Sequence, residues 1–148
     1  KKEKPQYLKL SIQYMIKQTV KADEFIIVKD GPLTHELDSV IDNYVKRYPG
    51  LFTIIANETN LGLGPALRKG VEVARNDLIA RMDSDDYCVP ERCEKQLNLF
   101  AINNELGMVG TYESEFVDHI DNVVSIHKVP EKHEDIKEMC CPSSYCYI

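Results

Sequence analysis

The sequence of 148 residues predicts an α/β fold, with a mostly parallel sheet and helices on both of its faces. Three observations support this fold class. Apolar residues at helical spacing alternate with short apolar runs from residue 7 to about residue 101. The short runs are rich in β-branched residues, as in strands covered on both faces. Two of them lead into carboxylates, Asp30 and Asp83 to Asp86, and ligands of such sheets bind beyond the carboxyl ends of the strands.

The elements follow one another in a regular order. Leu8, Ile12 and Met15 recur at the spacing of an amphipathic helix, and Pro49 with Gly50 closes the second helix. The pattern predicts helices over residues 7–18, 37–48, 66–74 and 90–101, and strands over residues 25–28, 52–56, 78–82, 108–112 and 123–126. The alternation is that of a Rossmann-like, doubly wound sheet.

The strand predicted over residues 78–82 delivers the acidic run Asp83-Ser84-Asp85-Asp86 at its C-terminal end. Carboxylates this close together repel one another unless a cation or a basic side chain lies nearby. Mg²⁺ commonly binds one or two carboxylates together with substrate phosphates, and Mn²⁺ prefers similar ligands. A solvated acidic turn or a helix cap would explain the same residues. The spacing alone leaves both interpretations open.

Composition narrows the classes of partner. The net charge of −6 and the absence of a basic stripe argue against nucleic acid. No apolar run approaches the roughly 18 residues that cross a bilayer, and residues 1–5 do not open a signal peptide. We therefore expect a cytoplasmic protein. An acidic chain that handles a phosphorylated ligand would need a divalent cation between the two.

The five cysteines do not form the pattern of a secreted disulfide framework, because their number is odd and their spacing irregular. His133, Cys140, Cys141 and Cys146 cluster near the C-terminus without a paired CxxC motif. Reduced thiols are favoured over a zinc site. The histidines, His119 among them, are expected to be structural or exposed.

Four segments resemble family 2 glycosyltransferases with the GT-A fold, and the resemblance covers roughly residues 7–130. Residues 25–31 are similar to the family's strand and Asp-Asp-Gly-Ser turn. Residues 57–64, followed by Lys69-Gly70, are similar to its Asn-x-Gly-Leu stretch and the next helix. Residues 80–86 match its Asp-x-Asp-Asp block, and residues 90–92 match the Pro-x-Arg behind it. Together, in this order, the segments make a specific match.

The resemblance implies inverting transfer of a sugar from a UDP-sugar donor to a carbohydrate or lipid-linked acceptor in bacterial-type surface polysaccharide synthesis. Asp30 would contact uracil, and Asp83 would lie on the ribose or pyrophosphate side. Asp85 would bind Mg²⁺ or Mn²⁺, and Asp86 would support the site or face the donor sugar. The metal would neutralise charge that grows as UDP departs. The backbone around Gly62 would lie close to the donor.

Some positions depart from the family pattern. Lys29 replaces the first acid of the usual pair, and Arg68 is shifted by one position, which rotates it by roughly 100° on a helix. The family's opening strand and its acidic catalytic base are not visible. Glu113 and Glu115 could serve as the base, although exposed strand or loop residues are favoured. We therefore expect residues 1–148 to be a single nucleotide-sugar-binding domain, a fragment without the first strand and the acceptor region.

Two other classes of function remain. A non-catalytic nucleotide-binding fragment or interaction module would explain the missing strand, the missing base and Lys29. A nucleotidyltransferase would need a glycine-rich phosphate loop with a lysine or arginine near the first strand, and the sequence shows none. Gly62-Leu63-Gly64 completes neither the dinucleotide motif nor the P-loop. An unpaired sheet position would favour a homo-oligomer. A lipid-linked acceptor would bring the chain to the membrane surface as a peripheral protein.

Overall fold

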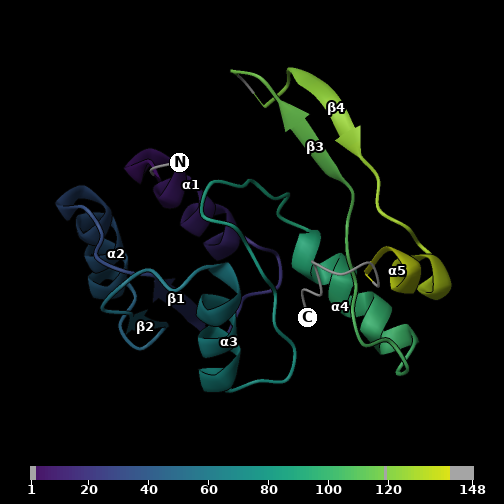
Figure 1. Cartoon of the computed structure of the whole chain (residues 1–148), viewed down its shortest axis with the longest axis horizontal. Coiled ribbons are helices and arrows are strands. Elements are labelled where there is room, and N and C mark those ends of the chain that lie inside the picture. Colours follow the sequence, from purple (N-terminus) through teal and green to yellow (C-terminus); the bar gives the residue numbers. More distant parts are fainter. Residues whose placement is uncertain (1–2, 119, 141–148) are drawn as a thin grey trace. The chain divides into compact units, whose positions relative to one another are not determined.

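The computed structural model describes residues 3–118 and 120–140 (Figure 1). The chain divides into two compact units, Lys1–Leu97 and Asn98–Ile148. The first unit contains a parallel sheet with helices, so the predicted α/β class is confirmed. In chain order its elements are α1 (Pro5–Ile16), β1 (Phe25–Lys29), α2 (His35–Arg47), β2 (Phe52–Ala56) and α3 (Leu63–Val73), and α4 (Arg92–Ile102) begins in it and ends in the second unit.

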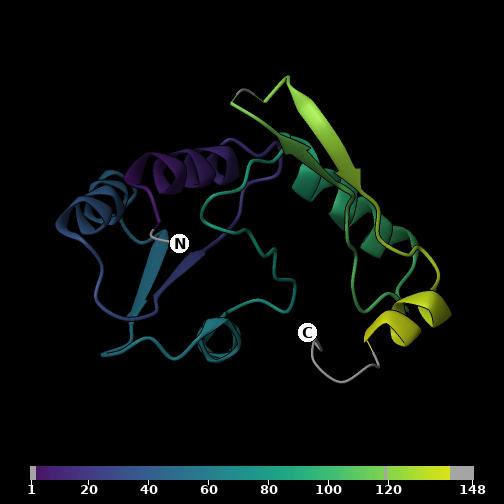
Figure 2. The same cartoon turned by 45° about the horizontal axis from the view of Figure 1, so that its top comes forward.

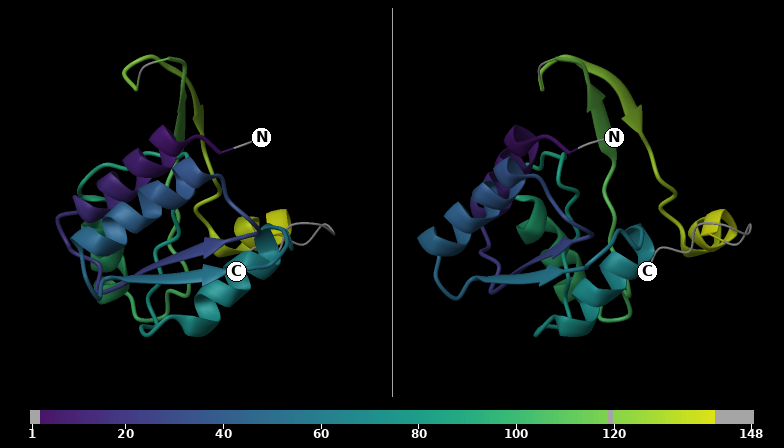
Figure 3. Two further views of the ribbon diagram at one scale, coloured as in Figure 1. Left: turned by 90° about the vertical axis from the view of Figure 1, so that its left-hand side faces the viewer. Right: turned by 60° about the vertical axis from the view of Figure 1, so that its left-hand side comes forward.

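The sheet of the first unit consists of β1 and β2, which pair in parallel from Phe25 opposite Phe52 to Lys29 opposite Ala56. Helices cover both of its faces, with α1 and α2 on one side and α3 on the other (Figures 2 and 3). Side chains alternate along β1 accordingly. Ile27 packs against the α1–α2 core, whereas Ile26 and Val28 lie beneath Gly70 of α3.

The core lies between α1 and α2 and extends onto the sheet. Its buried members are Leu8, Ile12, Leu37, Ile41 and Tyr44. These residues recur at helical spacing, so each helix buries one apolar stripe. The position of the core therefore fixes α1 and α2 against the first unit's strands.

Local signals explain where α2 begins and ends. The Thr34 hydroxyl accepts a hydrogen bond from the N–H of Leu37 at 3.4 Å, which satisfies one of the free donors of the first turn. Glu36 and Asp38 lie in the first turn, and Lys46 and Arg47 in the last. Each pair of charges complements the helix dipole at its end.

The strand predicted over residues 78–82 is wrong. Among the described residues this stretch joins no ladder, and Leu78 and Ile79 expose 54% and 52% of their surface. An apolar run becomes a strand only where a neighbouring backbone pairs with it, and among the described residues β1 pairs with β2 alone. The parallel sheet therefore has two strands in the described part of the chain, where three were expected. The acidic run follows an irregular segment.

The second unit contains an antiparallel hairpin of β3 (Glu113–Phe116) and β4 (Val123–His127), followed by α5 (His133–Cys140). The predicted strand at 123–126 is confirmed as β4. The strand predicted at 108–112 is wrong, because antiparallel pairing with β4 begins only at Glu113, which lies opposite His127. Asp118 adopts a φ of 62° in the hairpin connection.

Within residues 3–118 and 120–140, no helix is both long and apolar enough to cross a membrane. Cys88 and Cys93 are free thiols, and burial raises the pKa of both. His119, Cys141 and Cys146 lie outside the described residues, so the C-terminal cysteine and histidine cluster is not tested.

Candidate functional site

The Asp30 carboxylate links the end of β1 to the loop before α3. Its Oδ1 accepts hydrogen bonds from the amide of Asn57 at 2.8 Å and from the N–H of Leu61 at 2.9 Å. Its Oδ2 accepts a hydrogen bond from the N–H of Gly62 at 2.9 Å. The structure therefore brings together two of the predicted site residues, Asp30 and Gly62.

A buried asparagine and a lysine fix the geometry around Asp30. Asn57 exposes only 6% of its surface, and its Oδ1 accepts a hydrogen bond from Lys69 Nζ at 2.6 Å. Because Lys69 faces the amide oxygen, the amide nitrogen is directed at Asp30. The pKa of Asp30 is held below its ordinary value, mainly by the Leu61 N–H, then by Asn57, Gly62 and the charge of Lys69, while burial opposes them.

Glycine geometry permits this close approach. Gly31 has a φ of +98°, and a Cβ there would lie 2.9 Å from the backbone nitrogen of Asn60. Gly62, with a φ of +93°, forms the N-cap of α3. The two glycines allow the turn after β1 and the loop before α3 to meet at the Asp30 carboxylate.

Lys29 lies next to Asp30 in the sequence but has a different partner. Its Nζ forms an ion pair with Asp38 of α2 at 2.6 Å. The side chain therefore faces the α1–α2 side of the sheet, as expected for an odd position of β1 alongside Ile27. Lys29 thus neutralises a carboxylate of α2.

The acidic run forms an exposed turn whose first carboxylate is paired with arginine. Arg81 Nη2 donates to both Asp83 oxygens, at 2.8 and 3.0 Å. The N–H of Asp86 donates to the Asp83 carbonyl at 3.3 Å. Arg92 Nη2 donates to the Arg81 carbonyl at 2.7 Å, so the start of α4 reaches back across the turn. Asp83, Asp85 and Asp86 are exposed.

The donor set of this turn fits a hard divalent cation only in part. No group of three His, Cys, Asp or Glu side chains in the described part of the chain could hold a metal. Both Asp83 oxygens accept hydrogen bonds from Arg81, whereas no hydrogen bond or ion pair to the Asp85 carboxylate occurs among the described residues. The turn therefore suits a cation that binds one or two carboxylates and completes its shell with ligand phosphates.

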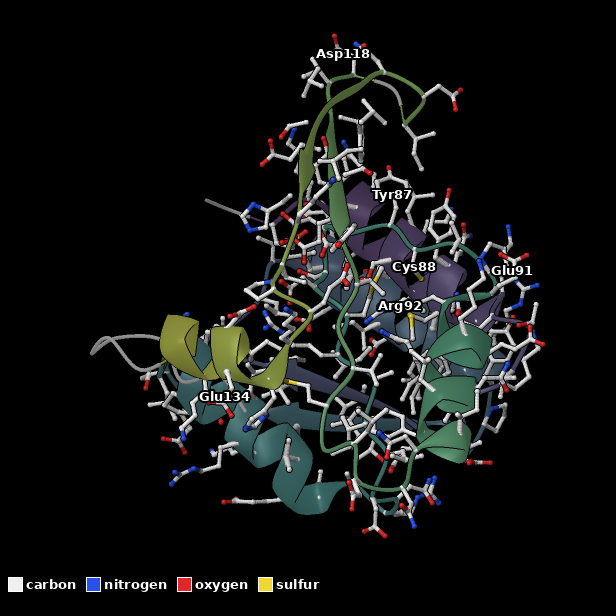
Figure 4. All side chains as sticks on the ribbon, turned by 90° about the vertical axis from the view of Figure 1, so that its right-hand side faces the viewer. Tyr87, Cys88, Glu91, Arg92, Asp118 and Glu134 are labelled. Carbon is white, nitrogen blue, oxygen red and sulfur yellow. The ribbon has the colours of Figure 1, made fainter. Side chains whose placement is uncertain are left out.

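The acidic turn rests on α1. The Ser11 hydroxyl donates to the Asp83 carbonyl at 2.9 Å. Tyr14 and Tyr87 meet edge to face with ring centroids 5.1 Å apart, and Cys88 Sγ lies 3.6 Å from Met15 Sδ. Tyr87, Cys88 and Arg92 can be located in Figure 4, where they lie near α1 and the start of α4. The helix thus supplies the support that the predicted strand would have given.

The two groups of site residues have separate partners. Asp30 and Gly62 belong to the network of the α3 loop, whereas Asp83, Asp85 and Asp86 share the acidic turn. Glu113 and Glu115 are exposed residues of β3, as the sequence favoured.

Sequence reasoning missed several residues that support the site. Lys69, which the sequence placed in the helix after residues 57–64 without a partner, is partly buried against Asn57. Ser11 was predicted to lie in the first helix but was given no role. Arg81 and Arg92 were placed next to the acidic run without partners. A polar residue on the core side of an amphipathic helix, as Ser11 is, was the available signal.

A parallel α/β unit with a carboxylate, Asp30, directly beyond its first strand is typical of α/β proteins that bind a ligand at the strand ends. The comparison with known families is more specific. The model of glycosyl transferase family 2 matches residues 1–140, and the chain belongs to that family.

Three relatives illustrate the membership. The amylovoran biosynthesis glycosyltransferase AmsE of Erwinia amylovora is 36% identical over 93% of the chain and 50% of its own length. A UDP-Gal:alpha-D-GlcNAc-diphosphoundecaprenol beta-1,3-galactosyltransferase of Escherichia coli is 36% identical over 92% of the chain and 49% of its own length. The uncharacterized glycosyltransferase MJ1057 of Methanocaldococcus jannaschii is 35% identical, over 89% and 44% respectively. The chain thus spans about half the length of these relatives.

Proposed function

We propose that this chain provides the donor site of a glycosyltransferase that transfers a sugar from a UDP-sugar to a carbohydrate or lipid-linked acceptor in bacterial surface polysaccharide synthesis. Family membership supports the reaction class. The name of the Escherichia coli relative, with a UDP-galactose donor and a diphosphoundecaprenol-linked acceptor, supports the kinds of substrate. The observation that carries the proposal is the exposed acidic turn, in which Arg81 holds Asp83 and leaves Asp85 available to a ligand.

Asp30 has a double role in this proposal. It holds the loop through Leu61 and Gly62, and among the described residues its Oδ2 accepts one hydrogen bond, from Gly62. A carboxylate offers about four lone-pair positions, so Oδ2 can accept a further N–H donor such as the imide of uracil. The depressed pKa of Asp30 keeps it ionised, and therefore an acceptor, at neutral pH. The backbone at Gly62 would border the donor.

The acidic turn would bind the diphosphate end of the donor. Asp85 would hold Mg²⁺ or Mn²⁺ jointly with the donor phosphates, and the bound metal would supply Lewis-acid stabilisation of the departing UDP. Asp83, fixed by Arg81, would lie on the ribose or pyrophosphate side. Asp86 would support the site or face the donor sugar.

The transfer we propose inverts the anomeric carbon by direct displacement. We assign the catalytic base, which would take the proton of the acceptor hydroxyl, to no residue of this chain. A lipid-linked acceptor would place the reaction at the cytoplasmic face of a membrane, with the protein bound peripherally. Copies of the chain could also associate through an open edge of the β1–β2 sheet.

Nucleotide preference tests the donor class. With Mn²⁺ present, UDP should raise the melting temperature of the chain more than ADP or GDP at the same concentration, because only a bound nucleotide stabilises the folded state. An equal response to all three would contradict a uridine site. Release of UDP from UDP-sugars would support an enzyme, whereas UDP binding without turnover would favour a non-catalytic nucleotide-binding module.

A further inference from the structure

The most buried polar side chain of the described residues lies near the C-terminal end of α1. Gln18 exposes 1% of its surface, less than the core residue Ile41 at 3%. An amide buried this deeply destabilises a fold unless its hydrogen bonds are satisfied. The contacts of the Gln18 amide must therefore explain why a polar side chain occupies this buried position.

Both ends of the Gln18 amide bind the segment that follows the acidic turn. Its Nε2 donates to the Val89 carbonyl at 2.9 Å, with longer contacts to the Tyr14 carbonyl at 3.2 Å and Cys88 Sγ at 3.3 Å. Its Oε1 accepts a hydrogen bond from the N–H of Cys93 at 2.9 Å. One side chain thus joins α1 to the backbone immediately before α4 and to its first turn.

Ser11 contacts the same part of the chain from within α1. It is a buried residue of the helix, and Gln18 lies two residues beyond the end of the helix at Ile16. Ser11 binds the carbonyl of Asp83, at the start of the acidic turn, and Gln18 binds Val89, beyond its end. The two side chains hold the backbone on both sides of Asp85 and leave the Asp85 carboxylate exposed.

We propose that Gln18 is a positioning residue, which, together with Ser11, fixes the acidic turn so that Asp85 is presented to a divalent cation and a nucleoside diphosphate. This inference rests on the function proposed above and extends it to a buried residue just beyond the end of α1. Gln18 would act only through the backbone of residues 83–93. Groups that act on metal ligands in this indirect way typically change metal affinity by about 10- to 100-fold when removed.

The test compares Gln18→Met with Gln6→Met in the full chain. Methionine keeps the length of the side chain and removes the hydrogen bonds of the amide, and Gln6 is an exposed glutamine of α1. The affinity for UDP is measured by calorimetry with Mn²⁺ and with a chelator. We expect Gln18→Met to lose about tenfold or more of the gain in affinity that Mn²⁺ gives, with chelator values within about twofold of the wild type. Gln6→Met should match the wild type in both conditions.

Two further variants guard against simple misfolding. Ser11→Ala removes one hydroxyl and should reduce the same metal-dependent gain with little change in melting temperature. Gln18→Glu can imitate the amide only when protonated, because a carboxylic acid offers one O–H donor and one acceptor. Its metal-dependent affinity, divided by that of the wild type at the same pH, should therefore rise as the pH falls.

Hydrogen exchange separates the failure of this inference from the failure of the proposed function. Gln18→Met should speed amide exchange across residues 83–93 relative to Gln6→Met, whether or not nucleotide binds. If exchange and the metal-dependent gain are the same in the two variants, the positioning role is overturned. If the wild type binds no UDP while exchange responds as expected, the proposed function fails and the attachment of the turn by Gln18 stands.

Discussion

Asp30 is the residue on which the loop before α3 depends. Its carboxylate gathers donors from Asn57, Leu61 and Gly62, and Lys69 reinforces them through Asn57. From the sequence, Asp30 was expected at the end of a strand, and the family resemblance implied that it contacts the uracil ring of a nucleotide. The hydrogen bonds show a second task that spacing could not reveal, because the partners are backbone N–H groups of a loop about thirty residues away.

The depressed pKa of Asp30 gives the loop a defined response to pH. A carboxylate whose folded pKa is lowered stabilises the fold fully above its unfolded pKa of about 3.9. That contribution is lost as the pH falls through the lower folded pKa. The carboxyl chemical shift of Asp30, followed by NMR, should therefore titrate with a midpoint below about 3.9.

Variants of α3 test the cause of this shift. Lys69→Met should raise the Asp30 midpoint, because it removes a nearby positive charge and the support of Asn57. Arg68→Met, at the exposed neighbouring position, is the matched control and should leave the midpoint unchanged. A midpoint at or above about 3.9 in the wild type would contradict the described network.

Helices were predicted well from the sequence, and the irregular connections were not. The four predicted helices, α1 to α4, and the strands β1, β2 and β4 lie where periodicity and turn residues placed them, within a few residues, whereas α5 was not predicted. The strands at 78–82 and 108–112 failed because an apolar run reports a tendency to be buried and says nothing of a pairing partner. The acidic run was singled out by its charge, and the structure places it in an exposed turn. Its attachment to Ser11 and Gln18 depends on contacts about seventy residues apart in sequence, which periodicity does not encode.

The turn between β1 and α2 offers a sharp test of element packing. Gly31→Ala should destabilise the fold more than Gly50→Ala, by about 1–3 kcal/mol. Both glycines have positive φ values, of 98° and 80°, so both variants carry backbone strain. Only at Gly31 would the new Cβ meet a neighbour, the backbone nitrogen of Asn60 at 2.9 Å.

Urea unfolding followed by circular dichroism measures the difference. In the Gly31→Ala variant, the amide resonances of the loop at Leu61 and Gly62 should also shift. Equal losses of stability in Gly31→Ala and Gly50→Ala would show that the turn and the loop do not approach each other as described.

In the first unit, the residues that hold the fold together differ from the carboxylates that we assign to the donor. The core between α1 and α2 fixes the parallel strands, and one side of α1 holds the acidic turn. Family membership places this arrangement among the glycosyltransferases of family 2. The second unit, Asn98–Ile148, contributes an exposed antiparallel hairpin and α5. The carboxylates that we assign to the donor all belong to the first unit.

Calorimetry of UDP binding by the Asp85→Ala variant tests the central claim most directly. With Mn²⁺ present, Asp85→Ala should weaken UDP binding by about tenfold or more relative to the wild type. In chelator the two should bind alike, and Asp42→Ala, at an exposed carboxylate of α2, should match the wild type throughout. If the wild type and Asp85→Ala bind UDP equally well both with and without Mn²⁺, the acidic turn is not the metal–diphosphate site.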